Sequence, residues 1–87
     1  MRHNLKILPQ YFDAQSAGIK NFEIRKHDRD FKIGDEIKLV EIDGRLGQPY
    51  ETTGRTLLLR ITYILSGNDF EGIEQGYSIL STERLED

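Results

Sequence analysis

Gly18 is the residue that most constrains how this chain can fold. It follows a short segment with helical spacing and precedes residues 19–25, where apolar and charged side chains alternate. Glycine adopts positive φ without a Cβ clash, so it can end a helix and reverse the chain sharply. The sequence therefore predicts a helix that stops at Gly18 and a strand directly after it, with Lys20 at the junction.

The strand after Gly18 is expected to have one apolar and one charged face. Side chains alternate along an extended backbone, so Phe22 and Ile24 should lie on one side and Glu23 and Arg25 on the other. Residues two apart on a strand are separated by about 6 to 7 Å. Glu23 and Arg25 are therefore close enough to share a ligand or to form a salt bridge on the polar face.

The rest of the chain predicts short strands separated by glycine-containing turns. A helix is expected from Pro9 to Ala17, because proline suits the first helical turn, with Phe12 as its anchor. Apolar residues on both faces of 36–42 are typical of a closed or strongly curved sheet. The other expected strands are 3–8, 56–65 and 77–81. We therefore predict a mostly β fold with one or two short helices, a small β-barrel with a helix at its side.

The segments between these elements carry turn and loop signals. Residues 26–30 are read as a charged turn, and Phe31 and Ile33 after it as core residues. Several glycines and a proline in 43–55 predict a loop or a mobile hairpin.

Length and composition limit the classes of protein to consider. A chain of 87 residues with 37% hydrophobic residues and a formal charge of −3 is expected to form one soluble globular domain over residues 1–87. The absence of cysteine excludes disulfides and thiolate metal sites and suits a reducing cytoplasm. No apolar run reaches the length of a membrane helix, so we expect a cytoplasmic protein without a membrane partner.

The charges are distributed unevenly along the chain. Residues 1–34 contain seven Lys or Arg and four Asp or Glu, a net charge of +3, whereas residues 35–87 contain five and eleven, a net charge of −6. A polyanion would therefore be attracted to the N-terminal third.

The pattern Gly18-x-Lys20-x-x-Glu23-x-Arg25 resembles the signature of the ASCH domain, a family with a PUA-like β-barrel fold. The resemblance covers nearly the whole chain and is to a compact bacterial or phage branch; it includes segments 3–7, 26–30, 31–35, 62–65 and 76–77. It implies a cleft beside the barrel, lined by the charged residues of the motif, that receives RNA or a nucleotide-like ligand.

The residue types suit that role. Lys20 offers a compact charge for a phosphate, Arg25 a planar fork for bidentate contacts, and Glu23 an acceptor for a base amino group or a ribose hydroxyl. Lys26 and Arg29 would extend the positive rim of the cleft. The simpler alternative is an exposed salt-bridge network of Lys20, Glu23 and Arg25 that closes a hairpin.

Tyr63 and Tyr77 are candidates for stacking on a base, although tyrosine in a barrel strand more often packs in the core or at the rim. His3 and His27 have no partner at metal-ligand spacing, so no metal site is expected, and no cofactor is expected either.

Catalysis is a further hypothesis, with Lys20 and Glu23 as its candidate residues. One branch of the superfamily resembles a small amidohydrolase that acts on acylated cytidine through a lysine and a threonine three residues later. Here the second position is Glu23, so the hydroxyl is missing. A hydrolase acting on RNA or a modified nucleoside would need Glu23 as a base, while an ion pair with Lys20 would keep the lysine charged.

A third hypothesis is a protein-interaction or regulatory module. It would use the acidic 71–87 region together with the 43–55 loop.

Overall fold

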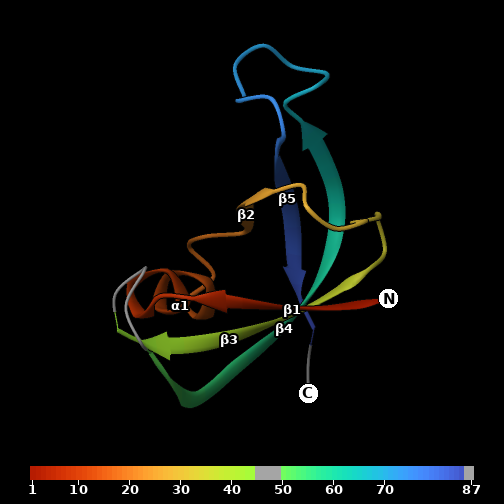
Figure 1. The fold of residues 1–87 in the computed structure, drawn as a ribbon. Coiled ribbons are helices and arrows are strands. Elements are labelled where there is room, and N and C mark those ends of the chain that lie inside the picture. The colour runs from red at the N-terminus through yellow and green to blue at the C-terminus, as the bar shows by residue number, and fades with distance from the viewer. Residues whose placement is uncertain (45–49, 86–87) are drawn as a thin grey trace.

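The computed structural model describes residues 1–44 and 50–85, which form a five-stranded sheet and one helix (Figure 1). The elements are β1 (Arg2–Ile7), α1 (Pro9–Ser16), β2 (Phe22–Lys26), β3 (Glu36–Asp43), β4 (Glu51–Ser66) and β5 (Tyr77–Arg84). The sheet order is β1-β3-β4-β5-β2, in which only the β1–β3 pair is parallel. The mostly β fold with one short helix is confirmed, and the curled sheet forms a half-barrel.

Strand β4 connects the two ends of the curled sheet. Its first part pairs with β3 from Glu51 to Arg60, and its second part pairs with β5 up to Ser66. In Figure 1 the strand bends beside β3 and then runs up to the loop that joins it to β5. β1 and β2 are the two edge strands, and they lie near each other, because Arg25 of β2 donates a hydrogen bond to Lys6 O of β1.

The core lies on the inner side of the curled sheet. Fully buried side chains of the central strands β3, β4 and β5 form its middle, and Phe12 of α1 and Phe31 cover it. The buried apolar residues are Leu5, Ile7, Phe12, Phe31, Ile37, Leu39, Leu57, Leu59, Ile61 and Leu80. The prediction that Ile33 is a core residue is wrong, because Ile33 lies in the turn before β3 and is 61% exposed.

The sequence signals at the ends of α1 are confirmed. Pro9 occupies the first turn, and the helix ends before Gly18, whose φ of +76° is the left-handed conformation predicted for it. The buried side chains of the helix are Phe12 and Gln15. Within the described part of the chain, α1 is the only helix, and no helix there is long and apolar enough to span a membrane.

Of the two alternatives predicted for 43–55, a loop or a mobile hairpin, the structure shows the pairing of a hairpin. Residues 45–49 lie outside the described residues, but β3 continues to Asp43 and pairs there with Glu51 of β4. The register shifts between Val40 and Ile42, and Gly54 lies opposite with a φ of +92°. A glycine that indicates a loop in the sequence therefore accommodates a β-bulge in a strand.

The face of β2 that points inward is the charged one. Phe22 and Ile24 alternate with Glu23 and Arg25 as predicted, yet Glu23 is 3% exposed and Ile24 is 57% exposed. Because the inner side of this edge strand faces α1, Glu23 has polar partners there, including Gln15. The predicted polar face is therefore the buried face.

Tyr63 lies on the outside of the sheet. From Leu57 to Ile61, the odd-numbered side chains of β4 point into the core. The register shifts between Ile61 and Tyr63, so that Ile64, an even-numbered residue, packs against the core instead. Tyr63 is 58% exposed as a result.

Candidate functional site

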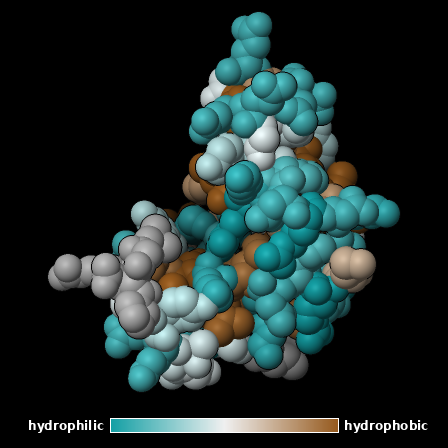
Figure 2. Space-filling model, in the orientation of Figure 1, coloured by the Kyte–Doolittle hydropathy of each residue, from teal (hydrophilic) through white to brown (hydrophobic). Residues whose placement is uncertain are grey.

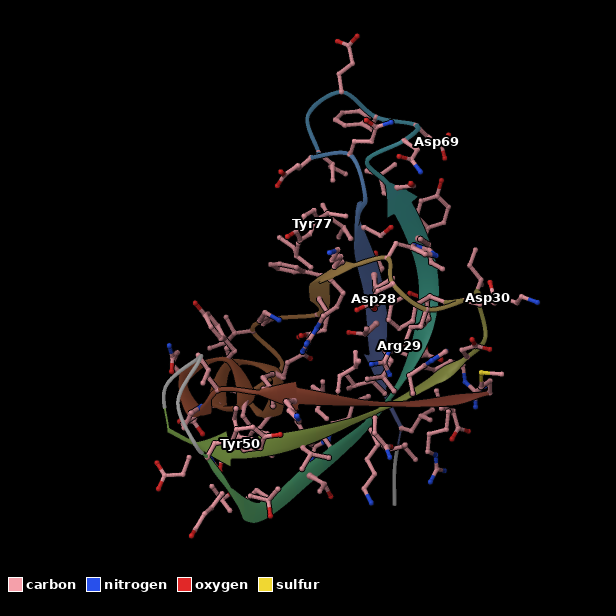
Figure 3. All side chains as sticks on the ribbon, viewed as in Figure 1. Asp28, Arg29, Asp30, Tyr50, Asp69 and Tyr77 are labelled. Atoms are coloured by element: carbon pink, nitrogen blue, oxygen red, sulfur yellow. The ribbon has the colours of Figure 1, made fainter. Side chains whose placement is uncertain are left out.

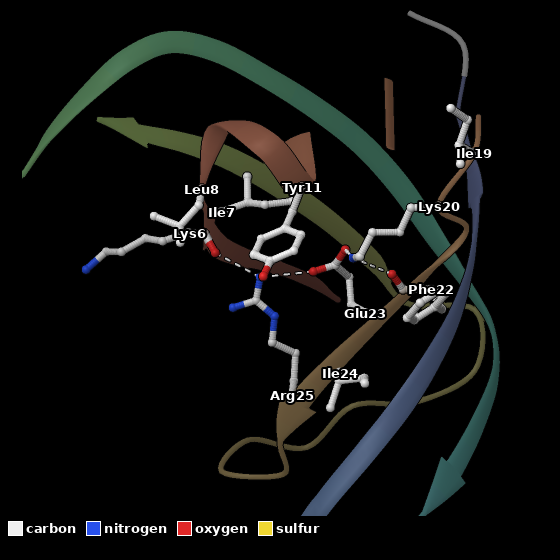
Figure 4. Close-up of a pocket in the computed structure, with 10 residues that line it drawn as sticks. All are labelled: Lys6, Ile7, Leu8, Tyr11, Ile19, Lys20, Phe22, Glu23, Ile24 and Arg25. Carbon is white, nitrogen blue, oxygen red and sulfur yellow. Dashed lines mark hydrogen bonds and ion pairs between the residues drawn. The ribbon is translucent and has the colours of Figure 1, made fainter. Parts of the chain in front are cut away.

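A pocket of about 660 Å³ lies between the end of β1, helix α1 and the free edge of β2 (Figure 4). Most of its wall is apolar, and a small number of charged side chains converge at its floor. Its lining residues are Lys6, Ile7, Leu8, Tyr11, Ile19, Lys20, Phe22, Glu23, Ile24 and Arg25. In Figure 2, apolar atoms are visible among hydrophilic ones at the junction between the part of the molecule that contains α1 and the part that contains β2 and β5.

The floor of the pocket is the buried carboxylate of Glu23. Its Oε2 accepts hydrogen bonds from Gln15 Nε2, at 2.8 Å, and from Lys20 Nζ. Its Oε1 accepts a hydrogen bond from Arg25 Nη2 at 3.1 Å. The carboxylate therefore fixes two cations side by side, one on each oxygen (Figure 4).

Lys20 reaches this carboxylate because of the turn that follows α1. Its backbone N–H donates to Ala14 O, and its Nζ donates to Phe22 O at 2.6 Å. The same Nζ lies 5.0 Å from the centroid of the Phe22 ring and 5.9 Å from that of Tyr11. An ammonium group has three donors, and in the part of the chain that the structure describes two of those on Lys20 have acceptors, which leaves one for a ligand.

Arg25 crosses the pocket from β2 to β1. Its Nη2 donates to Glu23 Oε1 and, at 2.8 Å, to Lys6 O at the edge of β1. A guanidinium has five N–H donors, and within residues 1–44 and 50–85 no acceptor is assigned to Nε or Nη1 of Arg25. These donors and the remaining one of Lys20 can face a bound anion.

Residues 2–82 match a protein family described as a domain of unknown function, DUF3850. The chain belongs to this family. The matched span contains every residue that lines the pocket of this DUF3850 domain. No curated protein matches the chain.

Four residues predicted for the site lie outside the pocket of the DUF3850 domain: Lys26, Arg29, Tyr63 and Tyr77. Lys26 is exposed at the end of β2, and Tyr63 lies on β4, separated from Phe22 by Ser81 in the same row of the sheet. Arg29 points from the loop after β2 toward β1, where its Nη1 donates to Asn4 O at 3.3 Å (Figure 3). The structure thus brings together Lys20, Glu23 and Arg25 only.

The other seven lining residues and Gln15 were not predicted for the site; those with polar or aromatic side chains are Lys6, Tyr11, Gln15 and Phe22. Gln15 lies one helical turn after Tyr11, a spacing that places both on the same side of α1. A glutamine three residues before a helix stop is a weak signal by itself. Its importance comes from Glu23, which packs against it only in the folded chain.

A second polar cluster of the DUF3850 domain surrounds Asp35. Buried His3 donates a hydrogen bond to Asp35 over 2.8 Å. This hydrogen bond is the main reason why the pKa of Asp35 is below its ordinary value, and the N-terminal ammonium lowers the pKa further. The Phe31 ring packs against both histidine rings, with centroid distances of 4.7 Å to His3 and 5.6 Å to His27. No set of three or more metal-binding side chains occurs among the residues described.

A third cluster joins α1 to the β3–β4 hairpin. Arg55 Nε donates to Glu41 Oε1 at 2.9 Å, and its Nη2 also donates to Asp13. Arg55 and Thr53 together hold the pKa of Glu41 below its ordinary value, and the two carboxylates raise the pKa of Arg55. The guanidinium stacks 4.4 Å from the Phe12 ring centroid, which explains the cluster as a structural support of α1.

The acidic region suggested as a protein-binding surface is divided between two elements. Residues 71–76 belong to the connection at the far end of β4 and β5, where Asp69 also lies (Figure 3). Residues 77–84 form β5, and residues 86–87 lie outside the described part.

Proposed function

We propose that this protein is a small RNA- or nucleotide-binding domain of the ASCH class, with a PUA-like fold, and that its ligand occupies the β1–α1–β2 pocket. The observation that carries the proposal is the buried carboxylate of Glu23, which fixes Lys20 and Arg25 at the floor of an apolar pocket. Burial of an ionic group is costly unless it is paired, so such a group supports a site better than an exposed salt bridge does.

The pocket has the dimensions and chemistry that a single nucleotide needs. A volume of about 660 Å³ lies within the range of small-molecule sites, which combine apolar walls with a few placed polar groups. The rings of Tyr11 and Phe22 offer surfaces for a base, while Lys20 and Arg25 offer donors for a phosphate. The fork of Arg25 suits a bidentate phosphate contact.

Glu23 serves in this proposal as a positioning residue. Its two oxygens accept three hydrogen bonds, from Gln15, Lys20 and Arg25, so it is engaged as an acceptor before any ligand arrives. A general base needs an oxygen directed at a substrate proton. The geometry therefore supports binding over hydrolysis with Glu23 as the base.

The charge of the chain favours a short ligand. Binding through many phosphates usually requires a basic protein, whereas this chain has a formal charge of −3 and two cations converge in the pocket. A mononucleotide or the end of a short single strand satisfies both facts.

The test is a titration of the four nucleoside 5′-monophosphates and a labelled single-stranded RNA hexamer into the wild-type protein at two salt concentrations. Lys20→Met keeps the aliphatic stem but removes the charge, and we expect it to weaken the best nucleotide by at least about tenfold, the loss of a charged hydrogen bond. Lys32→Met is the matched control, because Lys32 is exposed outside the pocket.

The outcomes of this titration separate the hypotheses. Equal weakening by both variants, or no binding of any nucleotide or RNA, would contradict the proposed function. Recovery of shortened RNA on a gel would place the protein among the hydrolases.

A further inference from the structure

Among the described residues, strand β2 has one edge without a neighbouring strand, and this edge opens into the pocket. β2 is the last strand in the sheet order, and its partner in this part of the chain is β5. The ladder with β5 is continued by Thr82 N–H donating to Asn21 O and by His27 N–H donating to Gly76 O. In an antiparallel pair, alternate residues direct both backbone groups to the partner strand. The backbone N–H and C=O groups of the odd-numbered residues of β2 therefore point toward β5, and those of the even-numbered residues point toward the pocket side.

Of these even-numbered residues, Ile24 is the one with both backbone groups available. Phe22 O accepts hydrogen bonds from Lys20 and Gln15, and Lys26 O accepts one from Asp28 N–H. For the N–H and C=O of Ile24, no partner is found within the described ranges 1–44 and 50–85. Ile24 also lines the pocket, beside the apolar walls (Figure 4).

We propose that the backbone N–H and C=O of Ile24 bind the hydrogen-bonding edge of the ligand's base. This inference rests on the proposed function and specifies how the same pocket would select its ligand. One residue in an extended strand presents a donor and an acceptor that point the same way. The Watson–Crick edge of a nucleobase presents an acceptor and a donor next to each other, so the two edges are complementary.

The pocket also has groups that can hold the phosphate of a nucleotide whose base contacts Ile24. Lys20 and Arg25 flank Glu23, the residue before Ile24, so a phosphate on these cations leaves the base beside the β2 edge. Removing a base from water leaves its polar edge unsatisfied unless the protein supplies partners. The Ile24 backbone supplies them without a specialised side chain.

An added peptide strand fits the same edge less well. Strand addition requires a run of free backbone groups along the edge. Here the C=O of Phe22 and the C=O of Lys26 are already bonded, which leaves a single residue with both groups available. One donor and one acceptor match a base better than they match a peptide strand.

The experiment compares nucleotides that differ only at the base edge. Adenosine and cytidine 5′-monophosphates are titrated against purine riboside and zebularine 5′-monophosphates, which lack the exocyclic amino group but keep the ring and the phosphate. We expect the natural member of the better-binding pair to bind at least about tenfold tighter, because an unmatched polar edge inside a pocket is costly. The Ile24 amide should shift downfield and exchange more slowly in that complex.

A variant pair tests the backbone contact directly. Ile24→Pro removes the N–H and is compatible with an edge strand whose N–H does not enter the ladder, whereas Ile24→Val keeps it. Ile24→Pro should bind about tenfold more weakly than Ile24→Val and should lose the preference for the amino group, which Ile24→Val retains. If Ile24→Pro fails to fold, the amide shift in the wild-type protein remains the deciding measurement.

The possible results distinguish this inference from the proposed function. If binding depends on Lys20 but is equal for the natural nucleotides and the analogues without the amino group, and the Ile24 amide signal does not move, the inference is overturned and the proposed function stays intact. Absence of all nucleotide binding overturns both. Protection of the Ile24 amide by an extended peptide, but by no nucleotide, would show strand addition at this edge instead.

Discussion

Gln15 Nε2 lies 2.8 Å from Glu23 Oε2 and 3.1 Å from Phe22 O, and these two hydrogen bonds attach helix α1 to strand β2 at the base of the pocket. A neutral amide thus orients the carboxylate that fixes Lys20 and Arg25. The position of both cations therefore depends on the packing of a short helix against an edge strand.

Replacement of Gln15 by leucine should reduce the free energy of unfolding by about 1 to 3 kcal/mol, the effect of losing a buried hydrogen bond to a charged group. Gln10→Leu is the matched control, because Gln10 is an exposed residue of the same helix. Urea denaturation measures both values. Equal effects of the two variants would mean that the Gln15–Glu23 contact contributes nothing to stability.

The Glu41–Arg55 pair should make stability sensitive to acid. The pKa of Glu41 is held below its ordinary value of 4.5, first by hydrogen bonding to Arg55. A carboxylate with a lowered folded-state pKa stabilises the protein fully above the unfolded-state value, and this contribution is lost as the pH falls through the folded-state value. Stability should therefore decline below about pH 4.5.

Urea midpoints measured from pH 6 down to pH 3 check this prediction. Glu41→Gln should be less stable than the wild type at pH 6 and should show a smaller decline toward pH 3. Glu51→Gln, at an exposed position of β4, is the control and should follow the wild-type curve. A decline in Glu41→Gln as steep as that of the wild type would assign the acid sensitivity to other carboxylates.

Two glycines should respond differently to alanine. Gly18 has a φ of +76° and open space around the position of a Cβ, so Gly18→Ala should cost only the left-handed conformation, about 1 to 2 kcal/mol. At Gly67 a Cβ would lie 2.1 Å from Glu74 O, so Gly67→Ala must displace the backbone of the β4–β5 connection.

Thermal unfolding and amide spectra separate these two effects. Gly18→Ala should lower the Tm with few changes in amide shifts, whereas Gly67→Ala should shift amides throughout 66–77. Unchanged shifts in 66–77 would show that this connection is arranged differently in solution.

The two arginines between β2 and β1 should contribute unequally to the order of β1. Both contacts are exposed, but Arg25 Nη2 donates to Lys6 O at 2.8 Å, whereas the contact between Arg29 Nη1 and Asn4 O is longer, 3.3 Å. The hydrogen bonds to Glu23 and Lys6 both come from Nη2 of Arg25, and Arg25→Lys keeps the charge but replaces this planar NH2 group by a compact, freely rotating ammonium. It should speed hydrogen exchange in β1 more than Arg29→Lys does.

Hydrogen exchange of the β1 amides, followed by NMR, gives the comparison directly. The amides of the central strand β3 serve as the internal reference, because they should exchange equally in both variants. Faster exchange in Arg29→Lys than in Arg25→Lys would reverse the assigned roles.

Local sequence signals predicted most of the secondary structure. Proline and glycine marked both ends of α1, and alternation located β1, β2 and β3. The errors arose where tertiary pairing outweighs local preference. Gly54 indicates a loop, but β4 begins at Glu51 because this segment completes its ladder with β3.

The candidate site could be predicted only in part for the same reason. Lys20, Glu23 and Arg25 were identified by their spacing, but which face of β2 is buried depends on α1, and Gln15 becomes part of the site only through that packing. A bulge in β4 turns Tyr63 to the outside, and such a shift leaves no clear mark in a run of apolar residues.

The contact between Arg25 and Lys6 O links the rigidity of the fold to its capacity to bind. One guanidinium group connects the two sheet edges of the half-barrel and also faces the pocket. If a ligand draws this group away from Lys6, part of the binding free energy is spent on loosening β1. A substitution that holds β1 in place without Arg25 would remove this cost of binding. The protein would then be both more stable and a tighter binder.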